Sequence, residues 1–274
     1  AIDEHYMPRF AGDKLPTTVT AQAVSIAEKL DTLVGIFGIG QIPTGDKDPF
    51  ALRRAALGVL RIIIEGKLDI NLAELLGVAA VQYMNVIWEL PKKPEKKDTD
   101  APSQVAVQVF DFMMGRLRIY YQDQGITADV FDAVYAQGPT RPLDFDSRLH
   151  AVTSFRKLAE AESLAAANKR ISNILKKTDT KIPEHYNADL LKDDAEKALA
   201  SRLGELEKQL KPMFDAREYE AAMKQLATLR DSVDQFFDDV MVMVDDESLR
   251  DNRLALLSNM RSLFLQVADL SILQ

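Results

Sequence analysis

The sequence contains no cysteine. Disulfide bonds, thiolate metal sites and cysteine catalysis are therefore excluded, and the absence fits a reducing compartment. Long apolar runs are also missing: no apolar run approaches the roughly 20 residues that a membrane-spanning helix needs. The opening AIDEHYMPRF has neither the regions of a secretory signal nor an initiator methionine. We therefore expect a cytoplasmic chain, processed or cut from a longer one, that makes no contact with membranes.

An excess of basic residues is missing too. The 274 residues include 34 lysines and arginines against 42 aspartates and glutamates, so the formal net charge is −8. This balance excludes a uniformly basic nucleic-acid coat and requires any nucleic-acid binding to come from a local basic patch. Hydrophobic residues make up 47% of the chain, which excludes a disordered protein. The length fits one large domain or two ordinary ones.

Strand patterns are absent, and helical periodicity takes their place. Apolar side chains recur at helical spacing in residues 105–117, 233–244 and 249–267. Residues 51–64 are richer in apolar residues all round, which predicts a central, buried helix. We predict that Asp48 caps this helix and that the proline after it takes the first helical position. The pattern as a whole predicts an all-α protein.

Proline-containing breaks divide the helical pattern. Residues 91–98 are charged and contain two prolines, which predicts an exposed loop. Residues 138–142 contain a glycine and two prolines, which cannot continue a helix, so we place a domain junction there. The predicted domains are residues 1–147 and 148–274. Within the second domain, residues 178–189 predict a polar loop.

Charge is unevenly distributed along the chain. Residues 148–177 hold seven basic and two acidic residues, whereas residues 231–251 hold eight acidic residues and one basic residue. Such a basic helix face is able to hold phosphates with lysine and a base edge with asparagine. The alternative is a solvated face whose cations interact with the helix dipole. The side chains near one face are Lys169, Asn173, Lys176 and Lys177.

Motifs of metal-dependent and nucleotide-binding enzymes are missing. None of His5, His150 and His185 has a second histidine at helical spacing, and no HExxH string occurs. The glycines of residues 35–40 have neither GxGxxG spacing nor a GKS or GKT ending, so they predict close helix packing and a turn. Residues 245–247 lack the spacing of an EF-hand loop and predict a cap for the last helix.

Aromatic residues lie mostly within helical patterns. This holds for Trp88 and for the pair Tyr120 and Tyr121. Aromatic side chains in such positions pack in a core more often than they stack on bases. We therefore predict packing roles for all three residues.

The most specific signals are long strings in a fixed order. They are HYMPRFAGD at residues 5–13, KLDTLVGIFGIG at 29–40, KDPFALRRAALG at 47–58, AAANKRISNI at 165–174, VMVMVDD at 240–246 and VADLSILQ at 267–274. Together these strings resemble the beta subunits of the bacterial two-subunit glycyl-tRNA synthetases. The resemblance covers essentially the whole chain and implies the C-terminal part of a longer one.

This resemblance implies two helical domains and a role in RNA binding. Residues 1–147 are expected to form an HD-like helical domain, truncated at its N-terminus, and residues 148–274 a DALR-type anticodon-binding bundle. In the family, two alpha and two beta chains form the active class II enzyme, and the alpha subunit activates glycine with ATP and magnesium. This chain is therefore expected to bind the anticodon arm of glycine tRNA, to bind no DNA or cofactor, and to be non-catalytic alone.

An HD-type metal-dependent phosphohydrolase is the alternative from another functional class. Such an enzyme holds its metal with a histidine, an adjacent His-Asp pair and a later aspartate, and this sequence has no His-Asp pair. Asp31 resembles the later aspartate, but its partners would lie before residue 1. We therefore expect no metal site in this chain. The third alternative is a helical scaffold that makes no contact with RNA.

The residues expected to contact tRNA are chosen by charge and position. In the second domain they are Lys169, Arg170, Asn173, Lys176, Lys177, Arg250, Asn252 and Arg253. The cations would position the RNA backbone, and one of the two asparagines would read a base edge. In the first domain, Arg53 and Arg54 are candidates for phosphate contact, and pairing with Asp46 or Asp48 is their alternative role. No catalytic residue is predicted.

Overall fold

The fold is helical throughout the part of the chain that the computed structural model describes. These are residues 2–10, 12–45, 47–89, 102–178 and 181–273, with the backbone alone for residues 84–89. In these ranges the only strand-like feature is an isolated bridge between Thr44 and Lys47. The predicted all-α class is therefore confirmed. The loop predicted at residues 91–98 lies outside the described residues.

Two compact units make up the chain. Unit 1 consists of Ala1–Gly125 and Thr140–Asp144, and unit 2 of Ile126–Pro139 and Phe145–Gln274. The backbone therefore passes between the units after residues 125, 139 and 144. A boundary at residue 147 assumes a single crossing, and it stays a prediction about the division into domains.

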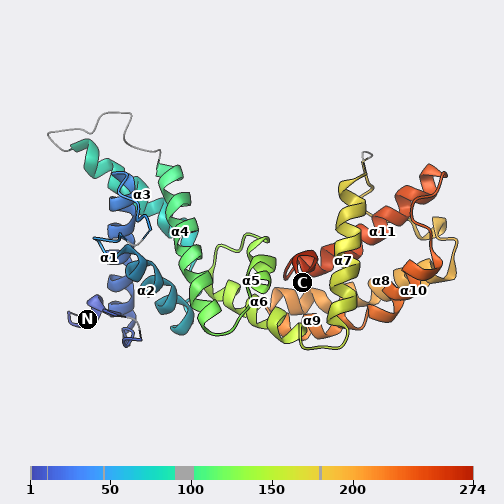
Figure 1. The fold of residues 1–274 in the computed structure, drawn as a ribbon, viewed down its shortest axis with the longest axis horizontal. Coiled ribbons are helices and arrows are strands. Elements are labelled where there is room, and N and C mark those ends of the chain that lie inside the picture. Colours follow the sequence, from blue (N-terminus) through green and yellow to red (C-terminus); the bar gives the residue numbers. More distant parts are fainter. Residues whose placement is uncertain (1, 11, 46, 90–101, 179–180, 274) are drawn as a thin grey trace. The chain divides into compact units, whose positions relative to one another are not determined.

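Unit 1 is a cluster of long helices (Figure 1), and the core between them is largely aliphatic. Helix α1 packs against α2, α3 and α4, and α4 also packs against α2 and α3. The fully buried side chains include Leu33, Leu60, Leu76 and Leu117. The elements are η1 (Glu4–Tyr6), α1 (Val19–Gly38), α2 (Leu52–Glu65), α3 (Leu72–Glu89) and α4 (Pro102–Asp123).

The glycines at the end of α1 allow α3 to approach closely. A Cβ atom on Gly38 would lie 2.8 Å from the Tyr83 ring, and one on Gly35 would lie 3.1 Å from it. Gly40 follows the helix with a φ of 76°, in the left-handed region that favours glycine. The packing and turn roles predicted for these glycines are therefore confirmed.

Helix α2 is buried on one face only, contrary to the prediction of a helix buried all round. Its arginines lie on the other face, and Arg54 is exposed. The helix begins at Leu52, so the proline after Asp48 lies before it. Asp48 still caps the helix, because its carboxylate accepts hydrogen bonds from the backbone N–H groups of Leu52 (2.8 Å) and Arg53 (3.0 Å).

Unit 2 packs its helices around α7, α8 and α11. The last element, η3, packs against α5 and α7, and the Asp269 backbone N–H donates to the Ala133 carbonyl at 2.8 Å. Helix α6 begins in unit 1 and continues into unit 2. The elements are α5 (Ala128–Tyr135), α6 (Pro142–Phe155), α7 (Ala161–Lys176), η2 (Ala188–Leu190), α8 (Asp194–Asp215), α9 (Tyr219–Ala227), α10 (Arg230–Asp239), α11 (Glu247–Leu265) and η3 (Leu270–Ile272).

The helix predicted through residue 244 ends earlier. Helix α10 stops at Asp239, and Val240 is already extended, with φ −113° and ψ 121°. Burial then alternates, because Val240 and Val242 are buried whereas Met241 and Met243 are exposed. That period of two is the pattern of an extended segment with one buried side. The prediction of helix for residues 240–244 is therefore wrong.

Candidate nucleic-acid interface

Helix α7 is anchored in unit 2 by one apolar face. Leu164, Ala167 and Ile171 are buried on it against neighbouring elements. Asn168 is 1% exposed, and its side-chain amide donates to the Leu164 carbonyl at 2.9 Å, so this polar group is satisfied within the helix. Because this face is buried, the opposite face of α7 is exposed to solvent, and the residues on that face are set by the helical spacing.

The exposed face carries most of the predicted RNA contacts. Lys169, Asn173 and Lys176 are spaced by four and three residues, which places them in one row along the helix. All three are exposed, as is Lys177 at the C-cap. We call Lys169, Asn173 and Lys176 the α7 row. It presents two cations and one amide at the C-terminal half of the helix.

Arg170 is separated from the α7 row. Its guanidinium carbon lies 4.2 Å from the centroid of the Phe237 ring on α10, a cation–π contact. Nearby, the Ser163 hydroxyl donates to the Asp234 carboxylate at 2.6 Å, which also ties α7 to α10. Arg170 is therefore exposed but oriented by its contact with the Phe237 ring of α10.

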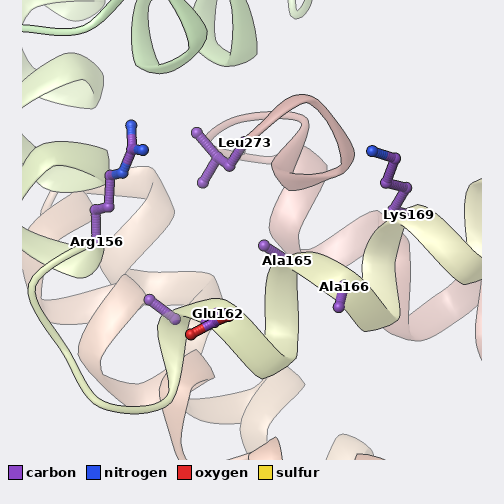
Figure 2. Close-up of a pocket in the computed structure, with 7 residues that line it drawn as sticks. Arg156, Glu162, Ala165, Ala166, Lys169 and Leu273 are labelled. Atoms are coloured by element: carbon purple, nitrogen blue, oxygen red, sulfur yellow. The ribbon is translucent and has the colours of Figure 1, made fainter.

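A hollow opens beside the α7 row. It has a volume of about 490 Å³, within the range of about 300–1,000 Å³ that is typical of ligand pockets. Helix α7 supplies Glu162, Ala165, Ala166 and Lys169, and Leu273 comes from the segment after η3. Figure 2 shows Arg156 and Lys169 on opposite sides of Ala165, with Leu273 above Ala165 and between the two cations. We call this site the α7 hollow.

The walls of the α7 hollow combine small apolar groups with charges at the rim. The two alanines leave a shallow floor that a planar group is able to approach. Arg156 is fixed at one rim, because its guanidinium bonds the Asp129 carboxylate at 2.7 Å and the Thr127 hydroxyl at 2.7 Å. Lys169, by contrast, extends from α7 as an exposed cation.

Arg250 is held by its own helix. Its guanidinium lies 3.8 Å from the Glu247 carboxylate and 3.7 Å from that of Asp251, and the side chain is half-buried. One guanidinium nitrogen also contacts the Val244 carbonyl at 3.5 Å. These contacts set Arg250 apart from the α7 row and leave its predicted RNA contact untested.

Asn252 is a structural residue rather than an RNA contact. It is 4% exposed, and its amide oxygen accepts a hydrogen bond from the Asn187 backbone N–H at 2.6 Å. Its amide nitrogen donates to the Asn187 carbonyl at 3.1 Å. Both polar groups are therefore engaged inside the unit, and the expectation that Asn252 reads a base edge is corrected by its burial.

Arg253 is likewise committed to the interior of unit 2. Its side chain is 5% exposed and bonds the Glu196 carboxylate, the Asp193 carboxylate (2.6 Å) and the Met241 carbonyl (2.7 Å). A guanidinium with three partners and almost no exposure is not available to a phosphate. The predicted role of Arg253 in RNA binding is therefore wrong.

Arg53 and Arg54 lie at the start of α2 in unit 1. The Arg53 guanidinium donates to the Gly45 carbonyl. Asp48 accepts from the Arg53 backbone, as described above, and Asp46 lies outside the described residues. Arg54 is exposed and lines a groove on the arginine-bearing face of α2.

Asp31, the candidate remnant of an HD-type metal site, is exposed on α1. Burial raises the pKa of the nearby Tyr83 phenol, and the Asp31 charge adds to that rise. Among the residues that the structure describes, no three histidine, aspartate or glutamate side chains form a cluster suited to a metal. His150 instead lies 3.3 Å from Asp146, one turn away on α6. In the same ranges, no helix is both long and apolar enough to cross a bilayer.

Of the residues that line the α7 hollow, sequence reasoning selected only Lys169 and missed, among others, Arg156, Glu162 and Leu273. Glu162 begins α7, Arg156 lies between α6 and α7, and Leu273 is more than a hundred residues further along the chain. The excess of cations in residues 148–177 includes Arg156 and was the one available signal for it. Nothing in the local pattern of Leu273 could reveal its place, because that depends on how η3 packs against α7.

Comparison with known proteins finds a matching family model in each half of the chain. Residues 1–136 match the family model described as "Glycyl-tRNA synthetase beta subunit", and residues 164–270 match the model described as "DALR anticodon binding domain". The second match contains the whole α7 row.

Curated relatives match along the full length of the chain. The chain is 56% identical over 274 residues to the "Glycine--tRNA ligase beta subunit" of Aeromonas salmonicida and 54% identical to that of Tolumonas auensis. In both cases the match covers 100% of this chain and 38% of the relative. The chain therefore spans little more than a third of the length of these relatives.

Proposed function

We propose, because the chain belongs to the family of glycyl-tRNA synthetase beta subunits, that unit 2 binds the anticodon arm of glycine tRNA. The observation that carries the proposal is the exposed α7 row beside the α7 hollow. Both features lie within or next to the residues that match the anticodon-binding model. RNA-binding proteins recognise single-stranded loops in this way, with cations on phosphates and a pocket for an unstacked base.

Each part of the interface has a chemical task in this proposal. Lys169 and Lys176 neutralise backbone phosphates of the anticodon loop, with Lys177 and Arg170 at the edges. One base lies on the floor formed by Ala165 and Ala166. The Glu162 carboxylate accepts a hydrogen bond from an exocyclic amino group, which cytosine, adenine and guanine carry and uracil lacks. Asn173 is the second group able to contact a base edge.

The complete enzyme sets the context of this contact. We propose that two alpha and two beta chains assemble in the cytoplasm. The alpha subunit carries out the ATP- and magnesium-dependent activation of glycine and its transfer to tRNA. This chain contributes RNA binding and holds no cofactor or catalytic residue of that reaction, so its role is to position the tRNA.

A fluorescence-anisotropy titration tests the proposal. The chain is titrated with glycine tRNA and with an anticodon-swapped tRNA at about 50 mM and about 200 mM salt. We expect binding that weakens with salt and a loss of about 1–3 kcal/mol on the swap. The double variant K169Q/K176Q should bind more weakly, with a salt slope shallower by about 1.4, or 0.7 for each lost phosphate contact. The matched control K208Q/K211Q removes two exposed lysines of α8 and should bind normally.

The outcomes separate the alternatives. Equal affinity for both tRNAs would remove base readout and leave only backbone contact. No binding at low salt would favour the scaffold that makes no contact with RNA. Release of phosphate from a phosphomonoester in the presence of added divalent metal would favour the HD-type phosphohydrolase.

A further inference from the structure

We propose that unit 1 carries a second RNA-binding site, a groove along α2 and α4 that holds single-stranded RNA by arginine–phosphate contacts and aromatic stacking. The choice of RNA as the ligand rests on the proposed function. The site itself does not, because it lies on unit 1 and outside the residues that match the anticodon-binding model. We call it the α2–α4 groove.

The α2–α4 groove is formed by helices that pack together. Helices α2 and α4 are in direct contact, and Pro8, Phe10 and Gly12 line the same depression. The volume of the groove is about 730 Å³. Arg54 and Arg61 stand two turns apart on α2, and Arg116 and Tyr120 stand one turn apart on α4. Cations therefore reach the groove from both helices.

The side chains of two of these arginines have no hydrogen-bond or ion-pair partner among the described residues. The Arg54 side chain is exposed, and within the described ranges only the backbone of this residue makes hydrogen bonds, with its N–H donating to the Ala51 carbonyl. Arg116 stacks its guanidinium 5.7 Å from the centroid of the Phe112 ring, and its buried Nε–H has no acceptor in the described part of the chain. Buried polar groups without partners are rare in folded proteins. An anionic ligand at this position would supply the missing acceptor.

Arg61, in the same groove, differs from Arg54 and Arg116 because its guanidinium is paired with a carboxylate. Its Nε lies 2.6 Å from the Glu65 carboxylate, one turn further along α2. This hydrogen bond raises the pKa of Arg61 and fixes the guanidinium in place. The contrast identifies Arg54 and Arg116 as the cations that remain available for a ligand.

Aromatic rings border the α2–α4 groove. Phe10 is 60% exposed, and Tyr120 is half-buried against Tyr121, with ring centroids 5.3 Å apart. The Tyr120 hydroxyl lies 3.5 Å from the Glu65 carboxylate, which turns the ring edge toward α2. The packing predicted for Tyr120 and Tyr121 is confirmed, and Tyr120 also lines the groove with the part of its ring that stays accessible. Accessible ring surface beside arginines without hydrogen-bond partners is the combination that binds single-stranded nucleic acid.

The combination of arginines and aromatic rings in the α2–α4 groove argues against an acidic peptide as the ligand. A peptide carboxylate would satisfy Arg54 and Arg116 as well as a phosphate does. It would, however, leave Phe10 exposed, because an acidic peptide has no regular planar groups to stack on the ring. RNA offers a phosphate and a planar base at every nucleotide, so it satisfies the cations and the rings together.

A binding experiment on the whole 274-residue chain tests this site. The probe is a fluorescent 12-nucleotide oligouridylate, which lacks the anticodon sequence. The double variant R54Q/R116Q should bind it at least tenfold more weakly, with a salt slope shallower by about 1.4. The matched control K47Q/K67Q removes two exposed cations of unit 1 outside the groove and should bind normally. Phe10→Ser should weaken binding about fivefold or more through loss of stacking.

The outcomes decide the proposal without reference to the anticodon contact. Equal losses in R54Q/R116Q and K47Q/K67Q would overturn it, as would polyglutamate that competes as well as oligouridylate. The single variant R54Q, at an exposed position, keeps the test valid if replacement of Arg116 perturbs the fold. If R54Q/R116Q loses oligouridylate binding while the anticodon swap has no effect, this site stands and the proposed function fails. The reverse result would leave only the anticodon contact.

Discussion

The Arg253 guanidinium and the Glu196 carboxylate form an ion pair inside unit 2, with side chains 5% and 0% exposed. The second Glu196 oxygen accepts from the backbone N–H groups of Lys192 (2.7 Å) and Asp193 (3.2 Å), which completes the capping box of α8. One buried pair therefore joins the start of α8 to the middle of α11. It also holds the Met241 carbonyl in the extended segment after α10.

Removal of the cation should destabilise unit 2. We expect Arg253→Met to lower the free energy of unfolding by about 3–5 kcal/mol, because Glu196 is left buried and unpaired. Urea denaturation followed by circular dichroism measures the change. The matched control is Arg250→Met on the same helix, where longer and more exposed ion pairs should make the loss smaller than about 1 kcal/mol. A loss in Arg253→Met no larger than that of the control would contradict a structural role for the pair.

Adding a single methyl group at the contact between α1 and α3 should lower the stability of the protein. Gly38→Ala places a Cβ atom 2.8 Å from the half-buried Tyr83 ring, so we expect a net loss of about 1–2 kcal/mol despite the better helix propensity of alanine. In a Tyr83→Ala background the obstacle is absent. The same Gly38→Ala change should then stabilise the protein by up to about 1 kcal/mol. Thermal unfolding of the four proteins of this cycle measures the coupling, and additive effects would refute it.

Stability at alkaline pH should respond to Lys29. This side chain is 6% exposed, its ammonium donates to the Ser25 hydroxyl at 2.8 Å, and burial lowers its pKa below the ordinary 10.5. The unfolded chain therefore binds the proton more tightly than the folded chain does, and Lys29 adds stability as pH rises through the folded pKa toward 10.5. As the pH rises toward 10.5, the urea midpoint of the wild type should therefore rise relative to that of Lys29→Met. An exposed control, Lys14→Met, should keep a constant difference from the wild type.

Filling the α7 hollow should weaken tRNA binding without loss of stability. Ala166 is an exposed residue on the floor of the hollow, so Ala166→Phe should cost about 1–3 kcal/mol of tRNA affinity by displacing a stacked base. Its midpoint of unfolding should stay within about 0.5 kcal/mol of the wild type. The control Ala216→Phe adds the same ring at an exposed C-cap on α8 and should bind normally. Unchanged affinity in Ala166→Phe would exclude the hollow from the interface.

Structural features that depend on residues close together in the chain could be predicted from the sequence. The close packing of the glycines at the end of α1 and the cap of α11 by Asp246, which accepts from the Leu249 N–H at 3.2 Å, both followed from short patterns. The exposed α7 row followed from helical spacing. In each case the partner or the periodicity lies within one or two turns of the residue.

Contacts between residues far apart in the chain could not be predicted from the sequence. Arg253 and Asn252 have the charge and polarity of surface residues, and only partners more than fifty residues earlier show that they are buried. The end of α10 was hidden for another reason. Residues 240–244 are apolar at every position, so the sequence alone could not separate a helical stripe from the alternating burial of an extended segment.

The hydrogen bond from Asp269 to Ala133 has a consequence for synthesis on the ribosome. It joins η3, the last element of unit 2, to α5, the first, across more than 130 residues. Most helical bundles form from contacts between neighbours in sequence and begin to fold as they are translated. The packing of unit 2 is complete only when η3 has left the exit tunnel. Until then, α5 and α7 lack the element that packs against both of them.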